Sequence, residues 1–147
     1  MTVAVIDYAA DEKRILEIID SMYESISWND RVLPDFDRFT AAVRNDAVVV
    51  PASRPAAPTD IRSFVNRMSG LHAGRAMKSF EEEAHRNTVK VFGNIAVAMG
   101  SFNALVDGSA NRGVNAWLFI REAGDWQIAA MAWDNETAST TLTGELA

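Results

Sequence analysis

The chain has 147 residues, of which 48% are hydrophobic and 23% are charged, and its formal net charge is -6. This length suits a single domain, which can bury roughly two-thirds of its unfolded surface. The 14 Lys and Arg residues are scattered rather than gathered in a basic patch, so nucleic-acid binding is not expected. The chain has no cysteine, which excludes disulfides, thiolate metal sites and cysteine nucleophiles and fits a reducing cytoplasm.

No apolar run approaches the roughly 18 to 20 residues that a membrane-spanning helix needs. The N-terminus has a short apolar run, but Asp7 interrupts it and no basic segment precedes it, so it does not resemble a signal peptide. We therefore expect a soluble, cytoplasmic protein that does not associate with membranes.

Three helices are expected in the first half of the chain. The first extends from Asp11, a candidate N-cap, to Ser27, because apolar residues recur there at three- and four-residue spacing. A second, shorter helix follows Pro34. A third begins after Thr59, a candidate cap, and ends near Gly70. The apolar residues of the first helix are Ile15, Ile18, Ile19, Met22 and Ile26.

Extended structure is expected elsewhere. The β-branched run Ala47–Pro51 indicates a short buried strand. After Gly74 the pattern becomes extended, and the turn signals "VFGNI", "VDGSANRG" and "REAGDW" separate successive strands. These four strands are expected near residues 78–91, 94–106, 113–121 and 126–134. We expect one domain over residues 1–147, with peripheral tails at about 1–10 and 136–147.

Three helices followed by an antiparallel meander predict an α+β fold in which the helices cover one face of a bent sheet. The segments "DFDRFTAAVRNDAVVVP", "FGNIAVAMGSF", "RGVNAWLFIREAGDWQIAAMAWDNE" and "TLTGEL" resemble a bacterial branch of the nuclear transport factor 2-like superfamily, a branch without an assigned function. The resemblance covers nearly the whole chain. It implies a cone-shaped α+β barrel and, commonly, a homodimer formed through the sheet.

The resemblance implies little about activity, because the superfamily includes ketosteroid isomerases, scytalone dehydratase, SnoaL-like polyketide cyclases and non-catalytic adaptors. The isomerases place an acidic base at the end of the first short strand, where this chain has Val50 and Pro51. Scytalone dehydratase needs a His and acid pair with several tyrosines, whereas this chain has only Tyr8 and Tyr23. The sequence therefore departs from both mechanisms.

The stretch "FEEEAHRN" (Phe80–Asn87) holds the first candidate catalytic residues. If Phe92 and Gly93 form a two-residue hairpin turn, His85 lies opposite Gly100, with Glu83 on the same face. Val89 and Val91 mark that face as the one packed against the helices. A histidine beside a carboxylate in the cone could act as a general acid or base.

Each candidate has a structural alternative. Residues 80–87 could project past the helices and leave Glu81 and Glu83 at a solvated rim, with His85 only hydrogen-bonded there. A one-residue slip would reverse every orientation. Tyr23, on the apolar side of the first helix, could donate to a ligand oxygen as a third catalytic residue, or could be a core tyrosine. His72 is expected to be a solvated loop residue.

Three further residues are candidate ligand contacts. Phe102 shares the inner face of its strand, Trp133 could stack on a ligand, and Asn115 could pin the hairpin or reach the mouth of the pocket. In the last two strands both faces are apolar, which favours a homodimer through the outer face of the sheet. One face is expected to carry Trp117, Phe119, Met131 and Trp133, and the other Val114, Leu118, Ile120, Trp126 and Ile128.

The function expected from the sequence is binding of a small organic molecule in a largely apolar pocket. If the protein is an enzyme, cofactor-independent lyase, isomerase or cyclase chemistry fits best. The alternative is a non-catalytic ligand-binding or protein-interaction module. No cofactor is expected, because the chain lacks G-x-G-x-x-G and P-loop motifs, and no metal is expected, because its histidines and acids lack ligand spacing.

Overall fold

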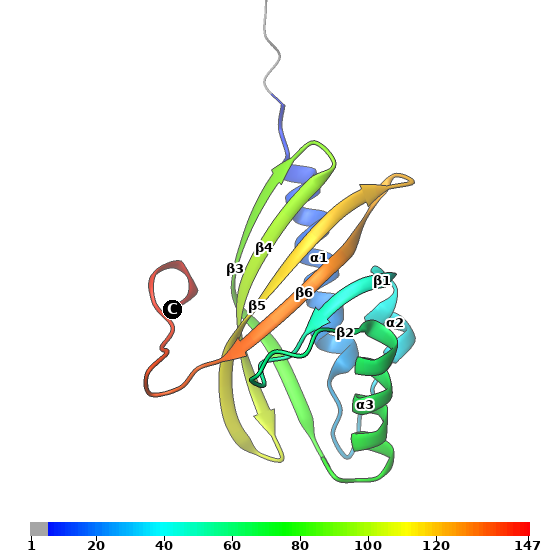
Figure 1. Ribbon diagram of the computed structural model, residues 1–147, viewed down its shortest axis with the longest axis vertical. Coiled ribbons are helices and arrows are strands. Elements are labelled where there is room, and N and C mark those ends of the chain that lie inside the picture. Colours follow the sequence, from blue (N-terminus) through cyan, green and yellow to red (C-terminus); the bar gives the residue numbers. More distant parts are fainter. Residues whose placement is uncertain (1–5) are drawn as a thin grey trace, which may run out of the picture.

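The structure, a computed structural model, describes residues 6–147 (Figure 1). Its α-helices are α1 (Ala9–Ile26), α2 (Phe36–Thr40) and α3 (Ile61–Ala73). Its strands are β1 (Val43–Val50), β2 (Thr59–Asp60), β3 (Phe80–Phe92), β4 (Ile95–Val106), β5 (Ser109–Glu122) and β6 (Asp125–Asn135). A short 3-10 helix, η1 (Gly144–Leu146), lies near the C-terminus.

The strands form one sheet in the order β2-β1-β6-β5-β4-β3. Only the β1–β6 pairing is parallel among the described residues, and the four long strands β3 to β6 form an antiparallel meander. The sheet is curved and unclosed, with α1 running along it and α3 beside β1 and β2 (Figure 1). The expected α+β cone, with three N-terminal helices on a mainly antiparallel sheet, is confirmed.

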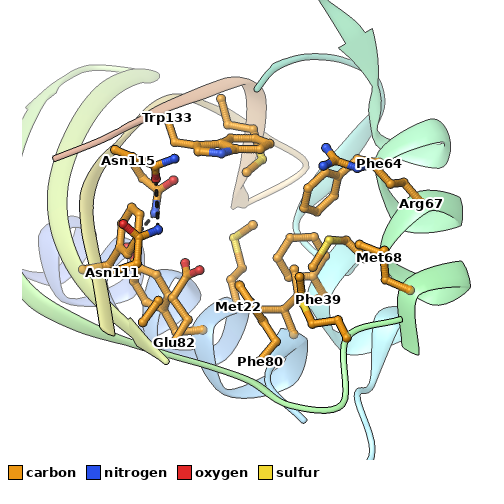
Figure 2. A pocket seen from close by; sticks show the side chains of 18 of the residues that line it. Met22, Phe39, Phe64, Arg67, Met68, Phe80, Glu82, Asn111, Asn115 and Trp133 are labelled. Atoms are coloured by element: carbon orange, nitrogen blue, oxygen red, sulfur yellow. Dashed lines mark hydrogen bonds between the residues drawn. The ribbon is translucent and has the colours of Figure 1, made fainter. Parts of the chain in front are cut away.

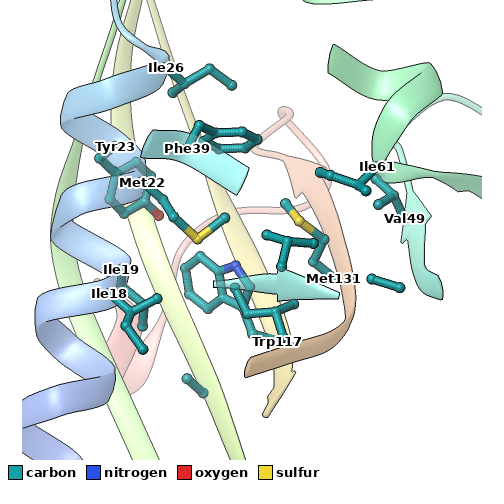
Figure 3. Packing of buried hydrophobic residues seen from close by; sticks show 14 of the residues in the cluster. Ile18, Ile19, Met22, Tyr23, Ile26, Phe39, Val49, Ile61, Trp117 and Met131 are labelled. Carbon is teal, nitrogen blue, oxygen red and sulfur yellow. The ribbon is translucent and has the colours of Figure 1, made fainter. Parts of the chain in front are cut away.

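The first helix has the predicted apolar stripe. Its members pack against β5 and β6 in the core, where Trp117 and Met131 face the helix (Figure 3). The helix begins at Ala9, earlier than predicted, and Asp11 is not its N-cap. The carboxylate of Asp11 instead accepts hydrogen bonds from Arg121 Nη1 at 2.7 Å and Trp126 Nε1 at 3.0 Å. The acid therefore joins the start of α1 to the β5–β6 hairpin.

The third helix is longer than predicted. Its N-cap is Asp60, whose side chain accepts a hydrogen bond from the Ser63 backbone N–H at 2.7 Å, whereas Thr59 lies in β2. The helix continues through Gly70 to Ala73. The added residues place Leu71 against the core and in the lining of the cavity described below.

The hairpin between β3 and β4 turns one position later than predicted. Phe92 pairs with Ile95, so Gly93 and Asn94 form the turn, and Gly93 adopts a φ of +57°, which glycine tolerates without strain. In this register Asn87 pairs with Gly100. The prediction that His85 faces Gly100 is therefore wrong.

A β-bulge interrupts β3 at His85. Ala84 pairs with Phe102 and Arg86 pairs with Ser101, which leaves His85 as the extra residue. A bulge shifts the alternation of side chains, so the residues before it change face relative to regular pairing. Glu82 consequently points inward, whereas Glu83 and His85 are exposed. The predicted inward orientation of Glu83 and His85 is wrong for this reason.

A second bulge lies in β6. Leu118 pairs with Ala130 while Phe119 pairs with Ile128, so one extra residue on β6 lies between them. Trp126 and Ile128 therefore lie on the inner face with the core and are only 2% and 0% exposed, which corrects the prediction that they lie on the face opposite Met131. The four residues predicted to share one face do so, and that face is the inner one: Trp117, Phe119, Met131 and Trp133.

The outer face of the sheet nevertheless exposes large apolar side chains. They lie on the central strands β4 and β5, with 41% to 54% of their surface accessible: Ile95, Val97, Met99 and Leu118.

The ends of the chain differ in what they contact. The segment after β6 folds back, with the Leu142 backbone N–H donating to Glu136, and η1 contacts β3. The predicted N-terminal tail lies partly outside the described residues. Within residues 6–147, no helix has the length and apolar character needed to cross a membrane.

Candidate functional site

A cavity of about 200 Å³ lies inside the cone, between α1, α3 and the inner face of the sheet (Figure 2). Its walls are mainly apolar, with methionines from α1, α3 and β6 among the aromatic rings. Phe64 and Trp133 meet edge to face, with ring centroids 5.3 Å apart. The aromatic residues of the lining are Tyr23, Phe39, Phe64, Phe80, Phe102, Trp117 and Trp133.

One wall of the cavity carries a polar group of three residues, Tyr23, Glu82 and Asn115. Asn115 is buried, and its Nδ2 donates a hydrogen bond to the Tyr23 hydroxyl oxygen at 2.8 Å. Glu82 comes from β3 and stands beside this pair (Figure 2). Three elements distant in the sequence therefore meet at one point of an otherwise apolar wall.

Glu82 is the acid of this group. Burial raises the pKa of Glu82 from 4.5 to about 7, because an apolar environment disfavours the carboxylate. Hydrogen bonding by the Asn115 side chain acts in the opposite direction and favours the charged form. The residue keeps some accessible surface, and it lines the cavity. Glu82 can therefore take up or release a proton near neutral pH, which is the property of a general acid or base.

Tyr23 is a hydrogen-bond donor at neutral pH. Burial raises the pKa of Tyr23, and the nearby negative charges of Glu82 and Asp20 act in the same direction. Its oxygen accepts the hydrogen bond from Asn115, so its own hydrogen remains for another acceptor. The phenol can therefore donate to an oxygen of a bound molecule.

Two glycines of the sheet leave space for side chains on neighbouring strands. A Cβ at Gly100 would collide with the side-chain amide of Asn87, which lies opposite it on β3. A Cβ at Gly113 would collide with the ring of Phe102 and with the Asp134 carbonyl. Glycine at these positions lets both side chains lie flat against the sheet.

The cavity brings together four of the residues predicted as site residues, namely Tyr23, Phe102, Asn115 and Trp133. Glu83 and His85 lie outside it because of the bulge. His72 is not a free loop residue either, since it closes α3 and its ring packs edge to face on Trp28 at 5.3 Å.

Sequence reasoning missed the two charged residues of the lining, Glu82 and Arg67. Glu82 could not be found from alternation, because the bulge breaks the alternation. Arg67 did have a signal: it is three residues after Phe64 and four before Leu71, which is the spacing of one helix face. Within residues 6–147, no group of three or more His, Asp or Glu residues is placed to hold a metal ion.

No protein-family model matches this sequence, and no curated protein matches it. Solved structures do. An NTF2-like protein of unknown function from Pseudomonas putida KT2440 is 17% identical, with a TM-score of 0.70 over 97% of this chain and 99% of that one. One from Shewanella baltica OS155 is 11% identical, with a TM-score of 0.67 over 91% and 100%.

A third similar structure is a protein from Novosphingobium aromaticivorans that is provisionally named a scytalone dehydratase. It is 10% identical, with a TM-score of 0.71 over 93% of this chain and 91% of that one. At such identities the likeness concerns the fold alone, and it confirms the fold that the sequence resemblance implied. The chain has the nuclear transport factor 2-like cone fold.

Proposed function

We propose that the protein binds a compact organic molecule in the cone cavity and that Glu82 transfers a proton to or from it. The observation that carries this proposal is a single carboxyl group on an apolar wall, with a pKa of about 7 and a phenol donor beside it. The lining combines apolar walls with a few convergent polar groups, which is typical of small-molecule sites.

A lyase or isomerase step fits these groups and needs no redox partner. The Glu82 carboxylate removes a proton from a carbon next to a ligand carbonyl, so an O–H bond forms as the C–H bond breaks. The electron pair moves to the carbonyl oxygen, where the Tyr23 hydroxyl stabilises the developing negative charge. The electron pair then returns from the oxygen and re-forms the carbonyl. In isomerisation Glu82 gives the proton to another carbon as the double bond shifts. In dehydration it gives the proton to a hydroxyl group on the neighbouring carbon, whose C–O bond breaks as a carbon–carbon double bond forms and water leaves.

The residue roles differ from those expected from the sequence. Glu82 replaces His85 and Glu83 as the proton-transferring group, and Tyr23 keeps its expected role. The acid comes from β3, whereas the end of β1 carries Val50. The provisional dehydratase among the similar structures supports dehydration as one of the two outcomes.

Hydrogen–deuterium exchange tests the proton transfer directly. We expect wild type to accelerate exchange at the carbon next to the carbonyl of 2-tetralone or phenylpyruvate in D₂O, followed by NMR. E82Q should lose this acceleration, because the amide cannot accept the proton, and E83Q should keep it, because Glu83 is exposed on the other face. Equal exchange rates with wild type and E82Q would refute the role of Glu82, and no acceleration by wild type would refute the step.

The outer face of the sheet favours a second role, in protein association. We propose that it forms a homodimer, because Ile95, Val97, Met99 and Leu118 are exposed together on neighbouring strands. Analytical ultracentrifugation should give a dimer for wild type and a monomer for V97E. A monomeric wild type would contradict the dimer. A dimer that lacks any cavity ligand would favour the non-catalytic interaction module.

A further inference from the structure

We infer that Arg67 selects ligands carrying an anionic group, such as a carboxylate, and holds that group at the mouth of the cavity. This inference rests on the proposed binding of an organic molecule in the same cavity. It adds to that proposal the chemical class of the ligand and the orientation in which it lies.

Arg67 lies where the cavity meets the surface. It lines the cavity and also an adjoining surface groove, and Trp133 and Asn135 line both as well. The side chain is exposed on α3 and reaches the cavity beside Phe64 (Figure 2). A ligand in the cavity can therefore contact the guanidinium group while that end of the ligand remains hydrated.

The guanidinium group of Arg67 has no partner within the described part of the chain, where it makes neither a hydrogen bond nor an ion pair. The adjoining groove contains one acid, Asp134, and its carboxylate forms an ion pair with the Arg54 guanidinium group, at 3.8 Å, rather than with Arg67. Arg67 thus keeps a planar fork of N–H donors, which matches the geometry of a carboxylate. In a protein of net charge -6, an unpaired arginine at a cavity mouth is a specific attraction for an anion.

The charges of the lining fix the orientation. Its titratable side chains are Tyr23, Arg67 and Glu82, and Figure 2 shows Arg67 and Glu82 on opposite sides of the cavity. An anionic group beside Glu82 would be repelled once that acid ionises. Elsewhere in the cavity it would be desolvated without a cation beside it, because Arg67 is the only cationic residue of the lining among the described residues. The anionic end therefore lies at Arg67, and the uncharged, reacting end lies at Glu82.

Matched acids and amides test the inference. The probes are cinnamate with cinnamamide and 2-naphthoate with 2-naphthamide, with dissociation constants measured by titration calorimetry. We expect wild type to bind each acid about three- to tenfold more tightly than its amide, the range of a partly solvated ion pair. R67Q should lose this preference while binding the amides as wild type does, and R67K should restore part of it.

Arg62 provides the control, because it is exposed on the same helix and does not line the cavity. R62Q should therefore keep the preference for acids. Equal binding of acids and amides by wild type, or an unchanged preference in R67Q, would overturn the role of Arg67 and leave cavity binding intact. No binding of any of the four probes by wild type would overturn both the inference and the proposed function.

Discussion

Asn115 Nδ2 donates to the Tyr23 hydroxyl oxygen at 2.8 Å, so the middle of β5 is joined to α1 inside the cavity. The same amide also favours the charged form of Glu82. One buried side chain therefore positions the phenol and adjusts the acidity of the carboxyl group. Because it acts on both Tyr23 and Glu82, Asn115 is the most informative residue to remove.

Replacing Asn115 should lower stability and weaken the acid. We expect N115A to reduce the free energy of unfolding by about 1–3 kcal/mol, because a buried polar contact is lost and Tyr23 is left unpaired. The pKa of Glu82 should rise above its wild-type value of about 7, because the remaining effect is burial. Urea unfolding and carbon NMR of the Glu82 carboxyl measure the two effects.

N111A is the matched control. The Asn111 amide makes a long hydrogen bond of 3.5 Å to Asn135 at the partly buried edge of the cavity. It should cost less stability and leave the Glu82 pKa unchanged. A Glu82 pKa that N115A does not alter would contradict the proposed coupling.

The raised pKa of Glu82 predicts that stability falls as pH rises. The folded state holds this proton up to about pH 7, whereas the unfolded chain loses it near pH 4.5. The stabilisation is therefore complete below the unfolded pKa and is lost as pH rises through the folded one, a change of about 3 kcal/mol. Denaturant unfolding at about pH 5 and about pH 8 measures the loss.

E82Q should lack this pH dependence, because it has no proton to lose, and E83Q should retain it. The carboxylates with lowered pKa values also contribute to stability, but their contribution is lost as pH falls below the range from about pH 5 to about pH 8. They therefore do not mask the effect of Glu82. They are Asp46, Asp60, Asp125 and Glu136. Identical pH profiles for wild type and E82Q would show that Glu82 titrates normally.

Replacing glycine by alanine should lower stability at two positions and raise it at a third. G113A should destabilise the protein by about 1–3 kcal/mol, because its Cβ would meet the Phe102 ring and a backbone carbonyl. G100A should do so as well, since it displaces Asn87. G70A should instead stabilise by about 0.5–1 kcal/mol, because it lies inside α3 with no atom near its Cβ. Thermal unfolding separates the signs, and a stabilising G113A would contradict the packing.

Asp11 should matter for stability although it is not a helix cap. D11A removes the acceptor of the buried Trp126 indole and of Arg121, so we expect a loss of about 1–3 kcal/mol. D7A is the control, because the exposed Asp7 accepts, among the described residues, a single hydrogen bond, from the Ala9 backbone N–H. Equal unfolding midpoints for the two variants would show that the contact contributes nothing.

The helices and hairpins could be predicted from the sequence because their signals are local. The stripe from Ile15 to Ile26 has one period, and the turn at Gly93 needs a left-handed backbone that glycine favours. The side of α1 on which Tyr23 lies could be predicted, because the helical repeat of 3.6 residues holds along the whole of α1. Phe102 and Trp133 follow from the alternation of side chains within β4 and β6, whereas alternation leaves open whether Asn115 pins the hairpin or reaches the pocket.

Glu82 could not be predicted, because its orientation depends on one unpaired residue in β3. Nothing in "FEEEAHRN" distinguishes a bulge at His85 from a regular strand, and the choice is made by the fit of β3 to β4 and α1. The same holds for Trp126 and Ile128 in β6. Alternation fails wherever pairing is settled by distant parts of the chain.

The irregularity at His85 also has a geometric consequence for the strand itself. Because a bulged strand bends, the additional residue contributes to the concavity that leaves space between the sheet and α1. Deleting His85 would keep Glu82 on its present side, because Ala84 would then be joined directly to Arg86 and the two side chains would alternate regularly. The strand would lose curvature. We therefore expect the variant without His85 to keep Glu82 facing the cavity but to have a smaller cavity for a ligand.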